Sequence, residues 1–139
     1  MDRNDALHWF ILGFGLSGWA DDFGRPTNLP ELWEDAKEAC FDCSKDELLD
    51  ALYTLPREHA SLIKFVPFGE GLHPVSFERV RNTVDWPDYF ASEPFSVKVL
   101  AEGRLRYREL SEQLENPRLV QALGVRKISA ATPLSVARR

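Results

Sequence analysis

The stretch from Cys40 to Phe68 places the tightest limits on the fold of this chain. Ser44 and Glu47 have the spacing of a capping box. In that motif the serine hydroxyl accepts the backbone N–H three residues on, and the glutamate reaches back to the backbone of the cap. The pattern predicts that a helix begins at Ser44.

The same helix has one apolar stripe, made by residues at intervals of four and three: Leu48, Leu52 and Leu55. Pro56 lacks a backbone donor, and it predicts that the helix ends near Thr54. After a short polar turn, residues 62–68 are of types that favour strands. We therefore expect a capped helix that is followed closely by a strand.

Two further helices are predicted ahead of this one. The first is capped by Asn4 or Asp5, and its apolar residues face nearly every side, which is typical of a helix in the centre of a core. The second begins at Asn28, where Asn28 and Glu31 repeat the capping-box spacing. Three glycines either permit close approach of a neighbouring element to the first helix or mark its end near Ser17: Gly13, Gly15 and Gly18.

The rest of the chain contains one more regular strand and a closing helix. Residues 19–27 are interpreted as a connection, whereas residues 95–100 alternate apolar and polar side chains and predict a strand. Asn116 and Pro117 end the helix that follows, and residues 119–125 add a turn of helix. The closing helix has its own stripe: Leu100, Gly103, Tyr107, Leu110 and Leu114.

This order of three helices, two strands and a helix resembles a winged-helix domain over about residues 5–115. Residues 47–55 followed by Leu62 and Ile63 are similar to the third helix of that family running into the first wing strand. Residues 97–107 resemble the passage from the last wing strand into the closing helix. The resemblance implies an α+β fold, with a three-helix core, a small antiparallel sheet and a closing C-terminal helix.

The length of 139 residues is that of one domain. We expect a winged-helix-like domain over residues 1–116, with a long wing insertion at 69–94, and a basic C-terminal extension over 117–139. No apolar run is long enough for a membrane helix, and no basic leader follows Met1. We therefore expect a cytoplasmic protein without membrane partners.

Charge is distributed unevenly along the chain. Residues 1–60 have a net charge of −8, and residues 61–139 have a net charge of +3. The winged-helix resemblance implies DNA binding, with the third helix in the major groove. That helix would present acidic side chains, which the phosphates of a duplex repel. The residues that we expect on its exposed side are one base and three acids: Lys45, Asp46, Glu47 and Asp50.

Our leading hypothesis is therefore a non-catalytic protein-interaction or assembly module, which binds a protein partner or a second copy of itself. Trp86, Tyr89 and Phe90 lie close to two prolines in the insertion. Aromatic residues of these types dominate interface hot spots, so they are the candidate anchors. The alternative is that Trp86 and Phe90 fold back as a lid over the core.

The rival hypothesis is a DNA-binding regulator that contacts phosphate through the wing and the basic tail. The same basic residues also suit ion pairs with the acidic half of the chain. The candidates are Arg79, Arg81, Lys98, Arg104, Arg108, Arg126 and Lys127.

Cys40 and Cys43 have the spacing of a redox pair or of half a zinc site. They fall between two predicted helices, which is not the setting of a thioredoxin-like pair, and we interpret them as structural, reduced cysteines. No phosphate-binding loop, dinucleotide motif or nucleophile elbow is present, and no cofactor or small-molecule ligand is indicated. A third reading is an enzyme with its site in the loop around His73. The histidines are His8, His59 and His73.

Overall fold

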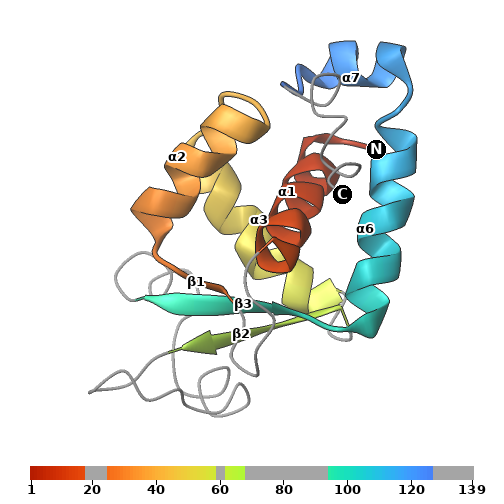
Figure 1. Ribbon diagram of the computed structural model, residues 1–139. Coiled ribbons are helices and arrows are strands. Elements are labelled where there is room, and N and C mark those ends of the chain that lie inside the picture. The colour runs from red at the N-terminus through yellow and green to blue at the C-terminus, as the bar shows by residue number, and fades with distance from the viewer. Residues whose placement is uncertain (18–24, 59–61, 68–93, 127–139) are drawn as a thin grey trace.

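The computed structural model describes four segments of the chain, residues 1–17, 25–58, 62–67 and 94–126. Helix α1 (Arg3–Leu16) lies at their centre (Figure 1). It packs against helices α3 and α6 and against strand β3. Its side chains are buried continuously from Ala6 to Leu12 and again at Phe14. An apolar surface on nearly every side is what a helix in this position requires, as the sequence pattern predicted.

The first helix begins earlier than the sequence suggested. Its cap is Asp2, whose carboxylate accepts the backbone N–H of Asp5 at 2.8 Å, while the Asp5 carboxylate accepts the Asp2 N–H at 3.3 Å. The prediction of a cap at Asn4 or Asp5 was wrong because a capping box is formed by two aspartates here, one of them at the cap itself.

Helices α2 (Leu29–Ala39) and α3 (Lys45–Glu58) begin where the capping residues predicted. The Asn28 side chain accepts the Glu31 N–H at 3.0 Å. The Ser44 hydroxyl accepts the Glu47 N–H at 3.0 Å, and the Glu47 carboxylate accepts the Ser44 N–H at 3.0 Å. These contacts are made within one turn of helix, so the local sequence is sufficient to specify them.

Helix α3 does not end near Thr54, as Pro56 led us to expect, but continues to Glu58. A proline lacks a backbone N–H and its ring crowds the carbonyl four residues earlier, but its fixed φ is compatible with helical backbone, and Pro56 lies only two residues before the end of α3. The helix therefore loses one hydrogen bond to the preceding turn and still completes the residues that follow the proline.

Within the described segments, the sheet has three antiparallel strands in the order β1-β3-β2. Strands β2 (Ile63–Pro67) and β3 (Phe95–Val99) were expected, and they pair with Ile63 opposite Val99 and Pro67 opposite Phe95. Strand β1 (Arg25–Thr27) pairs with the other edge of β3 and replaces the end of the connection expected over residues 19–27. It escaped prediction because it is three residues long and contains Pro26, which an edge strand tolerates.

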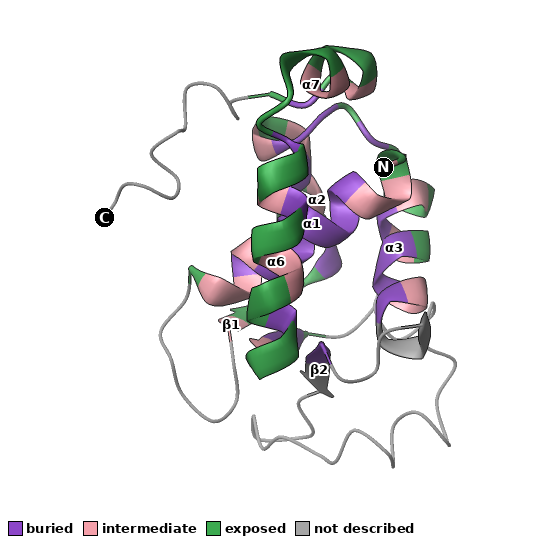
Figure 2. Cartoon of the chain, turned by 90° about the vertical axis from the view of Figure 1, so that its right-hand side faces the viewer, coloured by how far each residue is buried: buried purple, intermediate pink, exposed green. Residues whose placement is uncertain are grey.

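Helix α6 (Ala101–Gln113) leads from the sheet to helix α7 (Pro117–Leu123). Gly103, Leu110 and Leu114 are buried along its inner side, and Tyr107 is half-buried. Figure 2 shows this division, with exposed residues along the outer side of α6. After α7, Val125 is buried in the core. The first part of the C-terminal extension therefore packs against the domain.

The described segments form an α+β fold in which helices cover a small antiparallel sheet. The expected insertion at 69–94 lies almost wholly outside the described residues, as does the tail beyond residue 126. None of the helices in the described segments is long and apolar enough to span a membrane.

Candidate functional site

The outward side of α3 has a row of side chains at helical spacing, which we call the α3 stripe: Asp46, Leu49, Asp50 and Tyr53. Asp46 and Asp50 are exposed, while Leu49 and Tyr53 are half-buried. Their spacing of three and four residues puts them on one face, opposite the buried Leu48, Leu52 and Leu55. The stripe therefore presents two carboxylates beside two large side chains.

Among the described side chains, two cations near the start of α3 are engaged within the protein. Arg3 donates to both carboxylate oxygens of Glu47, at 2.9 and 3.0 Å. Arg3 and the N–H of Ser44 hold the pKa of Glu47 below its usual range, so Glu47 stays ionised. The Lys45 ammonium lies 5.3 Å from the centre of the Trp33 ring. The exposed carboxylates of Asp46 and Asp50 therefore give the four residues of the stripe a negative charge.

The basic candidates for phosphate contact do not lie on one element. Arg104 and Arg108 are exposed one turn apart on α6, and Lys98 is half-buried on β3. Arg126 forms an ion pair with Asp42, with Nη2 and Oδ1 2.7 Å apart. Figure 1 shows that α6 separates the sheet from α7, and hence Lys98 from the segment of Arg126. Arg79, Arg81 and Lys127 lie outside the described residues.

Some arginines of the basic half meet the acidic half of the same chain. Besides the pair of Arg126 with Asp42, Arg106 lies 3.9 Å from Asp5. Both pairs join residues after 100 to residues before 60, and they bring oppositely charged parts of the sequence together. The aromatic candidates Trp86, Tyr89 and Phe90 lie outside the described residues and stay sequence-based predictions.

Cys40 and Cys43 are both buried free thiols. The Cys40 thiol donates to the carbonyl of Ala6 at 3.8 Å, and burial raises its pKa to about 12. Burial also raises the pKa of Cys43. Within the described segments, no group of three or more histidine, cysteine or acidic side chains is placed to hold a metal ion.

His8 is buried, and its Nε2 atom lies 3.0 Å from the hydroxyl oxygen of Thr54. His59 and His73 lie outside the described segments.

We expect Cys40 to be unreactive in the folded protein. In a Cys43→Ala variant, a thiol-specific disulfide reagent at mildly alkaline pH should label almost nothing until guanidinium chloride is added, because a buried thiol with a pKa of about 12 provides almost no thiolate. Absorbance of the released thiol measures the labelling, and Cys40→Ala reports Cys43 in the same way. Rapid labelling of folded protein, or stoichiometric zinc by mass spectrometry, would contradict a structural role.

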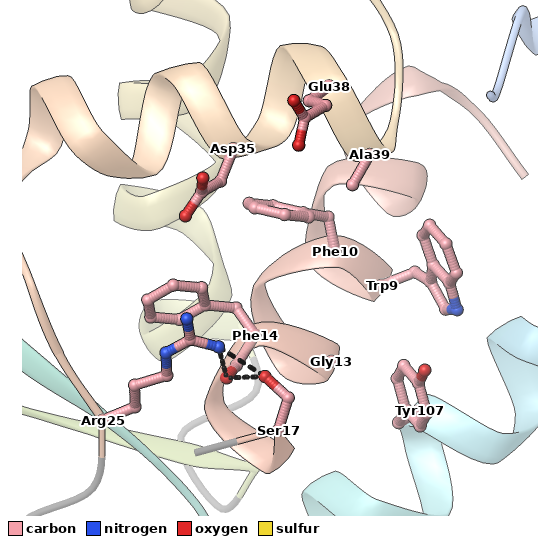
Figure 3. A pocket seen from close by; sticks show the side chains of 10 residues that line it. All are labelled: Trp9, Phe10, Gly13, Phe14, Ser17, Arg25, Asp35, Glu38, Ala39 and Tyr107. Atoms are coloured by element: carbon pink, nitrogen blue, oxygen red, sulfur yellow. Dashed lines mark hydrogen bonds between the residues drawn. The ribbon is translucent and has the colours of Figure 1, made fainter. Parts of the chain in front are cut away.

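A pocket of about 310 Å³ lies between α1, α2 and α6, with Arg25 of β1 at one side. Figure 3 shows the aromatic rings of α1 and α6 on its walls and two carboxylates of α2 beside them. The pocket was not predicted, because its residues come from four elements that only the tertiary fold brings together. The lining residues are Trp9, Phe10, Gly13, Phe14, Ser17, Arg25, Asp35, Glu38, Ala39 and Tyr107.

Two sets of contacts hold the pocket walls. The Trp9 and Tyr107 rings are stacked, with centroids 6.3 Å apart and planes inclined by 5°. The Trp9 indole N–H donates to the Ser111 hydroxyl at 3.0 Å. The Arg25 guanidinium lies 4.0 Å from the centre of the Phe14 ring and donates to the Ser17 hydroxyl.

The polar groups of the pocket are in an environment that differs from water. Burial and the neighbouring Glu31 raise the pKa of Asp35, although Arg25 acts in the opposite direction. Burial likewise raises the pKa of Tyr107. Tyr107 therefore stays neutral through the physiological range, and Asp35 is less stable as an anion than an aspartate in water.

Comparison of the chain with protein-family models, with curated proteins and with solved structures found no match. The α3 stripe and the pocket are therefore the features from which a function has to be inferred.

Proposed function

We propose that this chain is a non-catalytic protein-interaction or assembly module on a winged-helix-like scaffold, and that the α3 stripe contacts the partner. The scaffold part of the proposal is supported by three helices, an antiparallel pair of strands and a closing helix, which follow the expected order apart from the unpredicted β1 between α1 and α2. The functional part depends on one observation above all. The outward side of α3 has the exposed carboxylates of Asp46 and Asp50, while the adjacent Arg3 is bound to Glu47.

The charge of this surface argues against reading DNA with α3. A duplex has one negative charge per about 1.7 Å of its axis, and binding is driven largely by cations that displace counterions. A helix that brings two exposed aspartates to the groove adds repulsion where attraction is required. A basic protein surface, in contrast, is complementary to the same carboxylates.

The apolar part of the stripe favours a protein partner. Leu49 and Tyr53 share one face of α3 with the two aspartates, and both are half-buried. A partner can therefore cover their exposed parts without unfolding the helix. Tyrosine is enriched among the residues that dominate interface energies, and charged residues usually surround such a centre. We expect the partner to present apolar side chains flanked by lysine or arginine. A second copy of this chain remains a candidate, as do further contacts by Trp86, Tyr89 and Phe90.

The alternative is a DNA-binding regulator that contacts phosphate through the wing and the basic tail. It is favoured by the exposed Arg104 and Arg108, which lie one turn apart on α6. To form a phosphate-binding surface, these two arginines would need Lys98 beside them. They would also need the candidates outside the described residues, Arg79, Arg81 and Lys127.

The proposal is tested by capturing the partner at the stripe. A photo-crosslinking amino acid at Leu49, in the cells that naturally make this protein, should give a protein adduct that the same group at the exposed Glu112 does not give. The captured protein is then purified, and its affinity for the wild type and for Asp46→Lys/Asp50→Lys is measured. Reversal of two rim charges should weaken binding at least about tenfold.

The matched control is Glu112→Lys/Glu115→Lys, which makes the same change in net charge at exposed positions of α6 and the turn after it. This variant should bind the partner like the wild type. Equal affinities of all three proteins would contradict the proposal. A salt titration of duplex DNA binding tests the alternative, because retention of DNA at low salt by the wild type would favour a regulator.

A further inference from the structure

We propose that the pocket between α1, α2 and α6 binds a small organic cation, meaning an ammonium group on an apolar or aromatic body. This site lies on a different side of α1 from the packing with α3, and the inference does not depend on the proposed protein-interaction function. It follows from three properties of the pocket: aromatic walls, a carboxylate rim and a suitable size.

The walls are formed by the rings of Trp9, Phe10, Phe14 and Tyr107. Aromatic faces attract cations through their quadrupole, most strongly where water is excluded. The protein already uses one of these rings in this way, since the Arg25 guanidinium lies 4.0 Å from the centre of the Phe14 ring. The rings of Trp9, Phe10 and Tyr107 line the remainder of the same pocket.

The rim is formed by Asp35 and Glu38, which project from α2 on the side where the Phe10 ring lies (Figure 3). Burial raises the pKa of Asp35, and repulsion from Glu31, Glu38 and Glu34 of the same helix raises it further, while Arg25 lowers it. A cation bound between Asp35 and Glu38 would relieve that repulsion. The negative field of α2 therefore selects against an anionic ligand.

Within the described segments, the two cations of this region form no ion pair with the rim carboxylates, although the charge of Arg25 lowers the pKa of Asp35. Lys37, the one basic residue of α2, pairs with Glu34 at 3.3 Å and lies 3.7 Å from the centre of the Trp33 ring, outside the pocket lining. Arg25 donates to the Ser17 hydroxyl and to the Phe14 carbonyl at 3.4 Å. Neither side chain forms an ion pair with Asp35 or Glu38 among the described contacts.

The size of the pocket limits the ligand. Its volume of about 310 Å³ is at the lower end of the range for small-molecule sites. Gly13 contributes to this space, because a Cβ there would come within 2.9 Å of the Tyr107 ring and displace it. The pocket therefore suits one aromatic or branched alkyl ammonium ion.

The probe is benzyltrimethylammonium, compared with neutral benzyl alcohol and anionic phenylacetate by isothermal titration calorimetry on the full chain. We expect the cation to bind at least about tenfold more tightly than either analogue, because both the rings and the carboxylates favour positive charge. Equal or tighter binding of phenylacetate would overturn the proposal.

Variants locate the binding. Asp35→Asn/Glu38→Gln should weaken binding of the cation by about tenfold, whereas Glu34→Gln, on the same helix but outside the pocket lining, should change it by less than about twofold. Tyr107→Leu keeps an apolar side chain but removes a ring, and it should weaken binding by about threefold. The indole N–H signal of Trp9 in NMR spectra should shift with benzyltrimethylammonium.

Each of these readouts can refute the inference. An unchanged affinity in Asp35→Asn/Glu38→Gln, with the fold confirmed by circular dichroism, would show that the rim does not bind the cation. A Trp9 signal that does not move would place any binding elsewhere. Tighter binding of Nα-acetyl-lysine methylamide than of benzyltrimethylammonium would also overturn it, because the pocket would then fit a partner's lysine rather than a free ligand.

Discussion

Replacing Gly103 with alanine is expected to destabilise the protein through a steric cost of about 3 kcal/mol. Gly103 lies in the first turn of α6, where a Cβ would overlap the carbonyl oxygen of Leu62 and come within 2.7 Å of the Val99 side chain. The Leu62 carbonyl cannot easily move, because it accepts the backbone N–H of Leu100 at 2.8 Å. The added methyl group therefore has to push α6 away from the end of the sheet.

This cost is opposed by a gain of about 1 kcal/mol, because alanine is a better helix former than glycine. The midpoint of urea unfolding, followed by tryptophan fluorescence, measures the net effect. Arg104→Ala is the control, since it alters an exposed side chain at the next position of α6 and should change stability by less than about 0.5 kcal/mol. A Gly103→Ala protein as stable as the wild type would show that α6 does not approach Leu62 this closely.

The second large effect is expected for Leu52→Ala, which should lower the free energy of unfolding by about 3 kcal/mol. Leu52 is fully buried at 0% exposure on the side of α3 that faces α1. Its truncation removes apolar contacts and leaves a cavity that the surrounding helices fill only in part. Urea unfolding again measures the change.

Leu105→Ala is the matched control for Leu52→Ala. The substitution is chemically the same, but the Leu105 side chain is 55% exposed on α6, so it should cost less than about 1 kcal/mol. Similar losses for the two variants would mean that α3 does not contribute this face to the core. Both stability predictions concern the scaffold, and both are independent of what binds the α3 stripe or the pocket.

The predictions that succeeded depend on residues close together in the chain. Asn28 and Ser44 cap α2 and α3 through backbone groups within one turn, and the leucine stripe of α3 follows from helical spacing. The glycines of α1 illustrate a pattern with two readings. A Cβ at Gly15 would come within 2.7 Å of Val99 and 2.9 Å of Val97, so close approach to β3 is the reason for a glycine there.

The predictions that failed have local as well as distant causes. Pro56 signals a helix end, yet α3 continues to Glu58. Strand β1 contains a proline and only three residues, and its strand conformation depends on pairing with β3, which lies about seventy residues later in the chain. The acidic outward side of α3 could be foreseen from residue types, but the engagement of Arg3 with Glu47 could not.

By itself, the sequence determined where most helices begin, which faces of them are apolar and which parts of the chain are acidic or basic. Those properties depend on side chains within about one turn of each other, so they are readable without knowledge of the fold. The tertiary structure alone decided that Arg25, Asp35 and Tyr107 share one pocket, and that β1 completes the sheet. Such contacts join residues distant in sequence, and they form only when the packing of α1 against its neighbours brings their elements together.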